Sequence, residues 1–118
     1  MLLMKTISTC VWFGKSEHSY EYQIFSIDTV FRDVGGNFIL CDHDALGEWN
    51  PLYIGQAHDL FNLLGNENLK EWMTRQGVTH IHVHLERDKD RREQEKADLI
   101  ERFRPRLNRV SLHELGHD

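Results

Sequence analysis

Residues 36–41, GNFILC, and residues 51–56, PLYIGQ, are the two stretches from which the architecture can be worked out. Both are rich in the apolar, aromatic and β-branched residues that favour strands. Gly35 and Gly36 break the chain before the apolar run that begins at Asn37, and a polar loop containing Gly47 joins the first stretch to the second. The pattern predicts two neighbouring strands that form a hairpin.

The flanking sequence predicts further elements on both sides of this hairpin. Upstream, residues 9–13 and 20–27 have strand character and are separated by Gly14-Lys15-Ser16. Downstream, apolar spacing predicts helices near residues 57–64, 69–76 and 90–103 and an alternating strand over residues 79–85. We therefore expect one α+β domain over residues 1–118, with a small central antiparallel sheet flanked by about three helices and extended by an N-terminal hairpin.

Capping patterns set the expected ends of the helices. Asn68 followed by Glu71, and Asp90 followed by Glu93, are typical of capping boxes, and Pro105 should end the last helix. The buried face of that helix is expected to contain Ala97, Ile100 and Phe103.

Composition narrows the class of protein. Of the 118 residues, 40% are hydrophobic and 28% charged, which favours a folded domain over a disordered chain. The apolar runs are far shorter than the roughly 20 residues needed to cross a bilayer, and Met1 to Lys5 is too brief for a signal-peptide core. We expect a cytoplasmic protein with no membrane partner, in which Cys10 and Cys41 are free thiols.

Charge is distributed unevenly along the chain. The net charge is −5, which argues against non-specific coating of nucleic acid. Residues 87–109 nevertheless contain nine basic and six acidic residues, so this stretch carries +3 and the remainder −8. The stretch fits either a phosphate-binding edge or a solvated helix with internal ion pairs.

Two histidine patterns match the spacing of metal ligands. His80, His82 and His84 alternate along one expected strand face, where the spacing suits zinc, but a polar sheet face explains them more simply. His113 and His117 lie in a His-Glu-x-x-His pattern with only Asp118 behind it and no downstream third ligand. We expect no metal at either pattern.

The order of several short motifs carries a family resemblance. Gly36-Asn37-Phe38, Tyr53-Ile54-Gly55-Gln56, a helix ending in Asp98-Leu99-Ile100, then Pro105 and Asn108, together resemble the GIY-YIG nuclease family over residues 34–108. The match is closest to small stand-alone members, through Trp49 to Gln56 and Gly77 to His84. The resemblance implies a GIY-YIG-like fold and metal-assisted phosphodiester hydrolysis, with Mg²⁺ held by a glutamate, the phosphate by an arginine and the proton handled by tyrosine.

The chain departs from that chemistry at the positions that matter. Tyr53 and Asn108 match the family, but Phe38 replaces the first tyrosine and has no hydroxyl. Leu63 stands at the arginine position, and Lys96 stands at the glutamate position, where a cation would repel the metal. The resemblance therefore implies a cleavage-deficient domain without a cofactor.

Two functions of different class follow. In the first, the domain binds DNA or RNA, or a protein, without cleavage. Lys96 then either contacts phosphate, together with Arg91, Arg92 and Arg102 (with Arg104), or is a solvated surface lysine; its i±4 neighbours offer it no partner. In the second, an active Mg²⁺-dependent nuclease uses Tyr53 and a rearranged Glu95, the one weak metal candidate. A protein-interaction remnant of the fold is a variant of the first.

Overall fold

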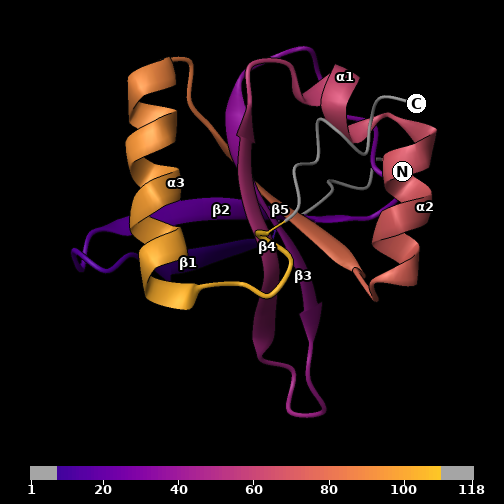
Figure 1. Cartoon of the computed structure of the whole chain (residues 1–118), viewed down its shortest axis with the longest axis horizontal. Coiled ribbons are helices and arrows are strands. Elements are labelled where there is room, and N and C mark those ends of the chain that lie inside the picture. The colour runs from indigo at the N-terminus through magenta and orange to yellow at the C-terminus, as the bar shows by residue number, and fades with distance from the viewer. Residues whose placement is uncertain (1–7, 110–118) are drawn as a thin grey trace, which may run out of the picture.

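The computed structural model describes residues 8–109, and within this range the chain forms five strands and three helices (Figure 1). In chain order they are β1 (Thr9–Phe13), β2 (Ser19–Ser26), β3 (Gly36–His43), β4 (Trp49–Ala57), α1 (Leu60–Leu64), α2 (Glu67–Arg75), β5 (His80–Leu85) and α3 (Lys89–Phe103). This is the order of elements predicted from the sequence.

The described strands form one curled antiparallel sheet in the order β1-β2-β5-β3-β4. β5 is central because the N-terminal hairpin pairs with one of its edges and the β3–β4 hairpin with the other. Phe38 pairs with Gly55, and Leu40 with Tyr53, on adjacent strands. The expected α+β class, the antiparallel sheet and the added hairpin are confirmed.

Helices cover both faces of the sheet: α1 and α2 lie on one side and α3 on the other (Figure 1). The side chains buried beneath α1 and α2 form what we call the helix-pair cluster, whose members include Phe38, Leu40, Leu52, Leu60, Leu63, Leu69, Met73, Ile81 and Val83. Those beneath α3 form the α3 cluster, which contains Trp12, Tyr22, Ile39, Cys41, Ile54 and Leu99. Side chains alternate between the two faces along β3, so this strand contributes residues to both clusters.

A bulge in the β3–β4 hairpin adjusts which residues of β4 face each cluster. The register shifts between Leu40 and Cys41, which pair with Tyr53 and Pro51 respectively. Leu52 is the extra residue, so Leu52 and Ile54 bury on opposite faces although they are two residues apart. Pro51 is tolerated because β4 is an edge strand.

Two helices begin earlier than predicted. In each, the N-cap is an asparagine or aspartate two residues before the predicted one. Asn66 accepts a hydrogen bond from the Leu69 backbone N–H, so Asn66 and not Asn68 caps α2. Asp88 accepts from the amides of Asp90 and Arg91, so Asp90 lies inside α3. The helix α3 ends at Phe103, and its C-cap Arg104 adopts φ 44° just before Pro105.

Burial differs from the predicted pattern on α3 and β5. Ala97 is exposed, and Leu99 is the residue of α3 that is fully buried in the α3 cluster. On β5, His82 is completely buried whereas Leu85 is 56% exposed, so the predicted half-buried strand is wrong. Both faces of β5 are covered because the sheet lies between helices. Within residues 8–109, no helix has the length and apolar character needed to span a membrane.

Candidate functional site

Three positions singled out by the family resemblance lie together in the helix-pair cluster. The rings of Phe38 and Tyr53 stack with their centroids 6.1 Å apart and their planes 17° apart. Phe38 is 1% exposed, and Leu63 packs in the same cluster with 9% exposure. A side chain at Gly55 would meet both rings within 2.7 Å, which explains why the strand carries glycine there. At the three positions that the resemblance singles out, the structure therefore shows mainly apolar packing.

Asn108 is positioned as a partner for the edge of β4. Its amide oxygen accepts from the Ile54 backbone N–H at 2.9 Å, and its amide nitrogen donates to the Ile54 carbonyl at 2.8 Å. Next to it, the Leu107 N–H donates to the Leu52 carbonyl. The segment after α3 is thereby fixed to β4, and the Asn108 amide is engaged with the backbone.

Lys96 is on α3, which covers the opposite face of the sheet from the Phe38–Tyr53 stack. Its ammonium lies 3.4 Å from a carboxylate oxygen of Glu93, three residues earlier. The other oxygen of Glu93 accepts from Gln56, which is on β4. The expectation that Lys96 lacks a partner is wrong, because the pairing is i,i+3 and not i,i+4.

Arg92 cannot act as an exposed phosphate contact in this structure. The residue is 4% exposed, and its guanidinium donates to the Gln56 side chain and to the carbonyls of Glu86 and Arg87. These bonds hold the β5–α3 connection against β4. The assignment of Arg92 to a nucleic-acid surface is therefore corrected to a structural role.

Arg91 and Arg102 are exposed on α3. They are eleven residues apart, or about three helical turns, so they project from the same side of the helix roughly 16 Å from each other. The Arg102 guanidinium lies over the Phe103 ring, 5.3 Å from its centroid. The four basic residues expected to act together thus separate into an exposed pair, a partly exposed Lys96 and a buried Arg92.

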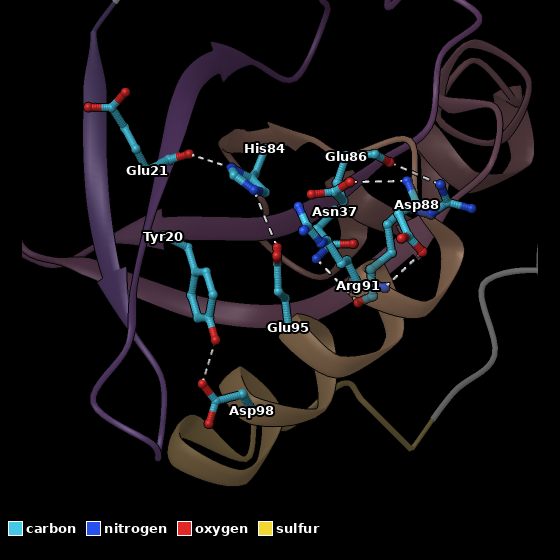
Figure 2. A network of polar contacts seen from close by, with 10 residues as sticks. Tyr20, Glu21, Asn37, His84, Glu86, Asp88, Arg91, Glu95 and Asp98 are labelled. Atoms are coloured by element: carbon cyan, nitrogen blue, oxygen red, sulfur yellow. Dashed lines mark hydrogen bonds and ion pairs between the residues drawn. The ribbon is translucent and has the colours of Figure 1, made fainter.

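Glu95 lies on the α3 side of the sheet and faces His84 of β5, as Figure 2 shows. A carboxylate oxygen of Glu95 is 3.3 Å from His84 Nε2. Burial raises the pKa of the Glu95 carboxyl, and the charge of Glu86 raises it further, while His84 and Arg91 act in the opposite direction. Tyr53 packs on the other face, so the structure does not bring Tyr53 and Glu95 together in one site.

His84, Glu86 and Glu95 form a cluster that the sequence patterns did not reveal. One ligand atom from each lies within 4.8 Å of the other two. Figure 2 shows them arriving from the end of β5, from the segment that follows it, and from α3. The His84-x-Glu86 spacing was the available signal, but Glu95 joins only because α3 folds back over the sheet.

A second polar network lies beside this cluster, where the β1–β2 turn meets α3. Asp98 accepts hydrogen bonds from the Tyr20 hydroxyl at 2.6 Å and from the hydroxyl and backbone N–H of Ser16 at 2.7 and 2.9 Å (Figure 2 shows the Tyr20 contact). Burial and the neighbouring Asp98 carboxylate raise the pKa of Tyr20 to about 12. An open pocket of about 420 Å³ lies here, lined by Ser16, His18, Tyr20, Arg91, Gln94, Glu95 and Asp98.

The other histidines of β5 do not extend the cluster. The buried Nδ1 atom of His82 accepts a hydrogen bond from the Trp12 indole at 3.0 Å, which makes it part of the α3-side core. His80 packs against the rings of His43 and Trp49. His113 and His117 lie outside the described residues.

Comparisons with models of known protein families, with curated protein sequences and with solved structures find no match to this chain.

Proposed function

We propose that this chain is a GIY-YIG-like domain that does not cleave nucleic acid and instead binds it weakly through α3. The observation that carries the first part is the packing of Phe38, Tyr53 and Leu63 in one apolar cluster. A phosphodiester in a cleavage site needs donors or a metal against its oxygens. The side chains at two of these three family positions can supply neither.

The arrangement of elements supports the family part of the proposal. The hairpin that contains Phe38 and Tyr53 is followed by two helices, by β5, which pairs with β3, and by α3. Lys96 adds to the case for lost cleavage, since a cation already paired with Glu93 occupies the position where the resemblance implies a metal ligand. Tyr53 and Glu95 lie on opposite faces, so the rearranged nuclease has no geometric support.

The exposed arginines of α3 support the binding part. Arg91 and Arg102 lie on one side of the helix. The two acidic residues between them on that side face the protein: Glu95 is turned toward His84, and Asp98 accepts hydrogen bonds from Ser16 and Tyr20. The side chains free to meet a phosphate are therefore basic. The net charge of −5 makes such binding weak and sensitive to salt.

Binding is tested by fluorescence anisotropy with labelled single- and double-stranded oligonucleotides over a range of salt concentrations. The Arg91→Ala/Arg102→Ala variant should weaken binding and reduce the log–log salt slope by about two units, one per phosphate contact. The matched control is Lys70→Ala/Arg75→Ala, which removes the same charge from α2 on the other side of the sheet. Equal losses in the two variants, or no binding at all, would contradict the proposal.

Cleavage is tested separately with Mg²⁺ and with Mn²⁺ on DNA and RNA. We expect none from the wild-type chain. Cleavage that disappears in Tyr53→Phe, a change that keeps the ring and removes only the hydroxyl, would show that the nuclease chemistry survives.

A further inference from the structure

A transition-metal site is the inference that the structure carries beyond nucleic-acid binding. We propose that His84, Glu86 and Glu95 bind one divalent first-row transition-metal ion, of which Zn²⁺ is the representative. The three side chains converge within 4.8 Å from separate segments. The proposal concerns the face of the sheet covered by α3 and does not depend on any cleavage or nucleic-acid function.

The tautomer of His84 is set by its surroundings. Its Nδ1 atom lies 2.8 Å from the Glu21 backbone carbonyl. A carbonyl only accepts, so Nδ1 carries the hydrogen, and the Nε2 atom of the neutral ring presents a lone pair. A carbonyl on the far nitrogen is the usual partner that orients a metal-binding histidine. His84 is thus oriented as a ligand toward Glu95 (Figure 2).

The Glu95 carboxylate presents the matching half of the site. Its Oε1 atom is buried and accepts no hydrogen bond from any described residue. It lies 3.3 Å from the His84 Nε2 atom. Two lone pairs face each other across this gap, and a buried acceptor without a donor is unfavourable by about 1–3 kcal/mol. A cation bound between the two atoms would satisfy both.

The spacing between His84 Nε2 and Glu95 Oε1 suits two ligands of a tetrahedral ion. Zinc lies about 2.0–2.1 Å from histidine nitrogen and about 2.0–2.2 Å from carboxylate oxygen, so two ligands at a tetrahedral angle are about 3.3–3.5 Å apart. The observed 3.3 Å falls in this range. A third ligand comes from Glu86, whose Oε2 atom accepts from the Asp88 N–H at 3.0 Å and is thereby oriented.

The ligand set and its access narrow the choice of ion. One imidazole with two carboxylates suits Zn²⁺, Co²⁺ or Mn²⁺, whereas Mg²⁺ prefers oxygen ligands in a strict octahedron. Glu95 also lines the open pocket beside the β1–β2 turn, through which an ion would reach the site. Arg91 lines the same pocket and competes for the carboxylate charge.

The test is calorimetric titration of the folded full-length chain with Zn²⁺, with Mg²⁺ as the contrast. The background is His113→Ala/His117→Ala, which removes the other zinc-like pattern. We expect one Zn²⁺ per chain, no comparable Mg²⁺ binding, and a rise in melting temperature with Zn²⁺. Loss of a residue that only orients a metal ligand weakens metal binding by about 10- to 100-fold. Glu95→Gln and His84→Ala each remove a ligand, so each should weaken Zn²⁺ binding by more than that.

Controls separate coordination from folding. Glu95→Gln keeps the shape of the side chain, so it should fold even if His84→Ala does not. His18→Ala removes an exposed histidine that lines the adjoining pocket and should leave Zn²⁺ affinity unchanged. Absence of Zn²⁺ binding, or equal affinity in wild type and Glu95→Gln, would overturn the proposal and leave His84 and Glu95 as a proton-linked pair. Oligonucleotide binding is measured without metal, so the two proposals can fail independently.

Discussion

The side-chain amide of Asn108 satisfies both backbone hydrogen-bonding groups of Ile54, accepting at 2.9 Å and donating at 2.8 Å. Ile54 lies on β4, an edge of the sheet. Unpaired edge groups would otherwise be available to another chain. Asn108 thus supports the fold directly.

Asn108→Asp should destabilise the protein by about 1–3 kcal/mol, because the donor to the Ile54 carbonyl is replaced by a second acceptor. Chemical denaturation measures the free energy of unfolding. Gln94→Glu makes the same amide-to-carboxylate change at an exposed position of α3 and should have little effect. If the two variants are equally stable, the Asn108 contact contributes nothing to the fold.

Asp98 fixes the turn between β1 and β2 to α3. Burial raises the pKa of its carboxyl, but the hydrogen bonds from Tyr20 and Ser16 outweigh that effect and hold the pKa below the ordinary aspartate value. Asp98→Asn should destabilise the chain by about 1–2 kcal/mol. This value is near the lower end of the range of energies for hydrogen bonds to charged groups, because the site is partly exposed. Amide hydrogen exchange over residues 14–20 should accelerate.

The pH dependence of this contact has a definite sign. Because the folded pKa is lowered, the contribution is complete above the unfolded pKa, roughly 3.9, and is lost as the pH falls through the folded value. Glu101→Gln on the exposed side of α3 is the control. Unchanged exchange at the turn in Asp98→Asn would show that the hairpin docks by its apolar contacts alone.

His82 should make stability depend on pH over a higher range. Burial, and to a lesser extent His80, lower the pKa of His82 to about 4 from 6.5. The unfolded chain then binds a proton that the folded chain does not, so stability is full above about pH 6.5 and falls as the pH drops toward 4, by of the order of 3 kcal/mol. His82→Gln, which can still accept from Trp12, should flatten this slope; His18→Gln should not.

Local patterns were enough to predict the order of the elements and the sheet, because strand alternation and turn residues can be recognised within each segment alone. The start of α2 was missed because Asn66 and Asn68 are both acceptable caps, and only the fold selects Asn66. His82 was expected on a polar face. Its hydrogen-bond partner Trp12 is seventy positions away, so the sequence around His82 gives no sign of this contact.

For the candidate sites too, contacts within one hairpin could be predicted from the sequence, whereas contacts between distant segments could not. Phe38 and Tyr53 could be placed together from the hairpin, since their strands are neighbours in sequence. The pairing of Glu95 with His84 depends on how α3 crosses β5, which no spacing rule specifies. The partner of Lys96 is a local i,i+3 contact, which was overlooked because only i,i+4 neighbours were considered.

Leu63 stands where the family resemblance places an arginine, and substitution there tests whether this part of the core tolerates a charge. The residue is 9% exposed and packs with Phe38 and Tyr53. Leu63→Arg restores the charge that the resemblance implies, but it places a guanidinium among apolar side chains. We expect destabilisation of about 2–4 kcal/mol from lost packing and a poorly solvated charge.

Leu63→Met, which conserves volume and polarity, should lose less than about 1.5 kcal/mol. Chemical denaturation compares the two variants. Leu63→Arg/Lys96→Glu should still fail to cleave DNA with Mg²⁺, because Phe38 lacks a hydroxyl and α3 lies on the other face of the sheet from the Phe38–Tyr53 stack. Should Leu63→Arg prove as stable as Leu63→Met, the arginine must have reached solvent beside Tyr53. The position would then be open to a phosphate, and the proposed absence of cleavage would rest on Phe38 and Lys96 alone.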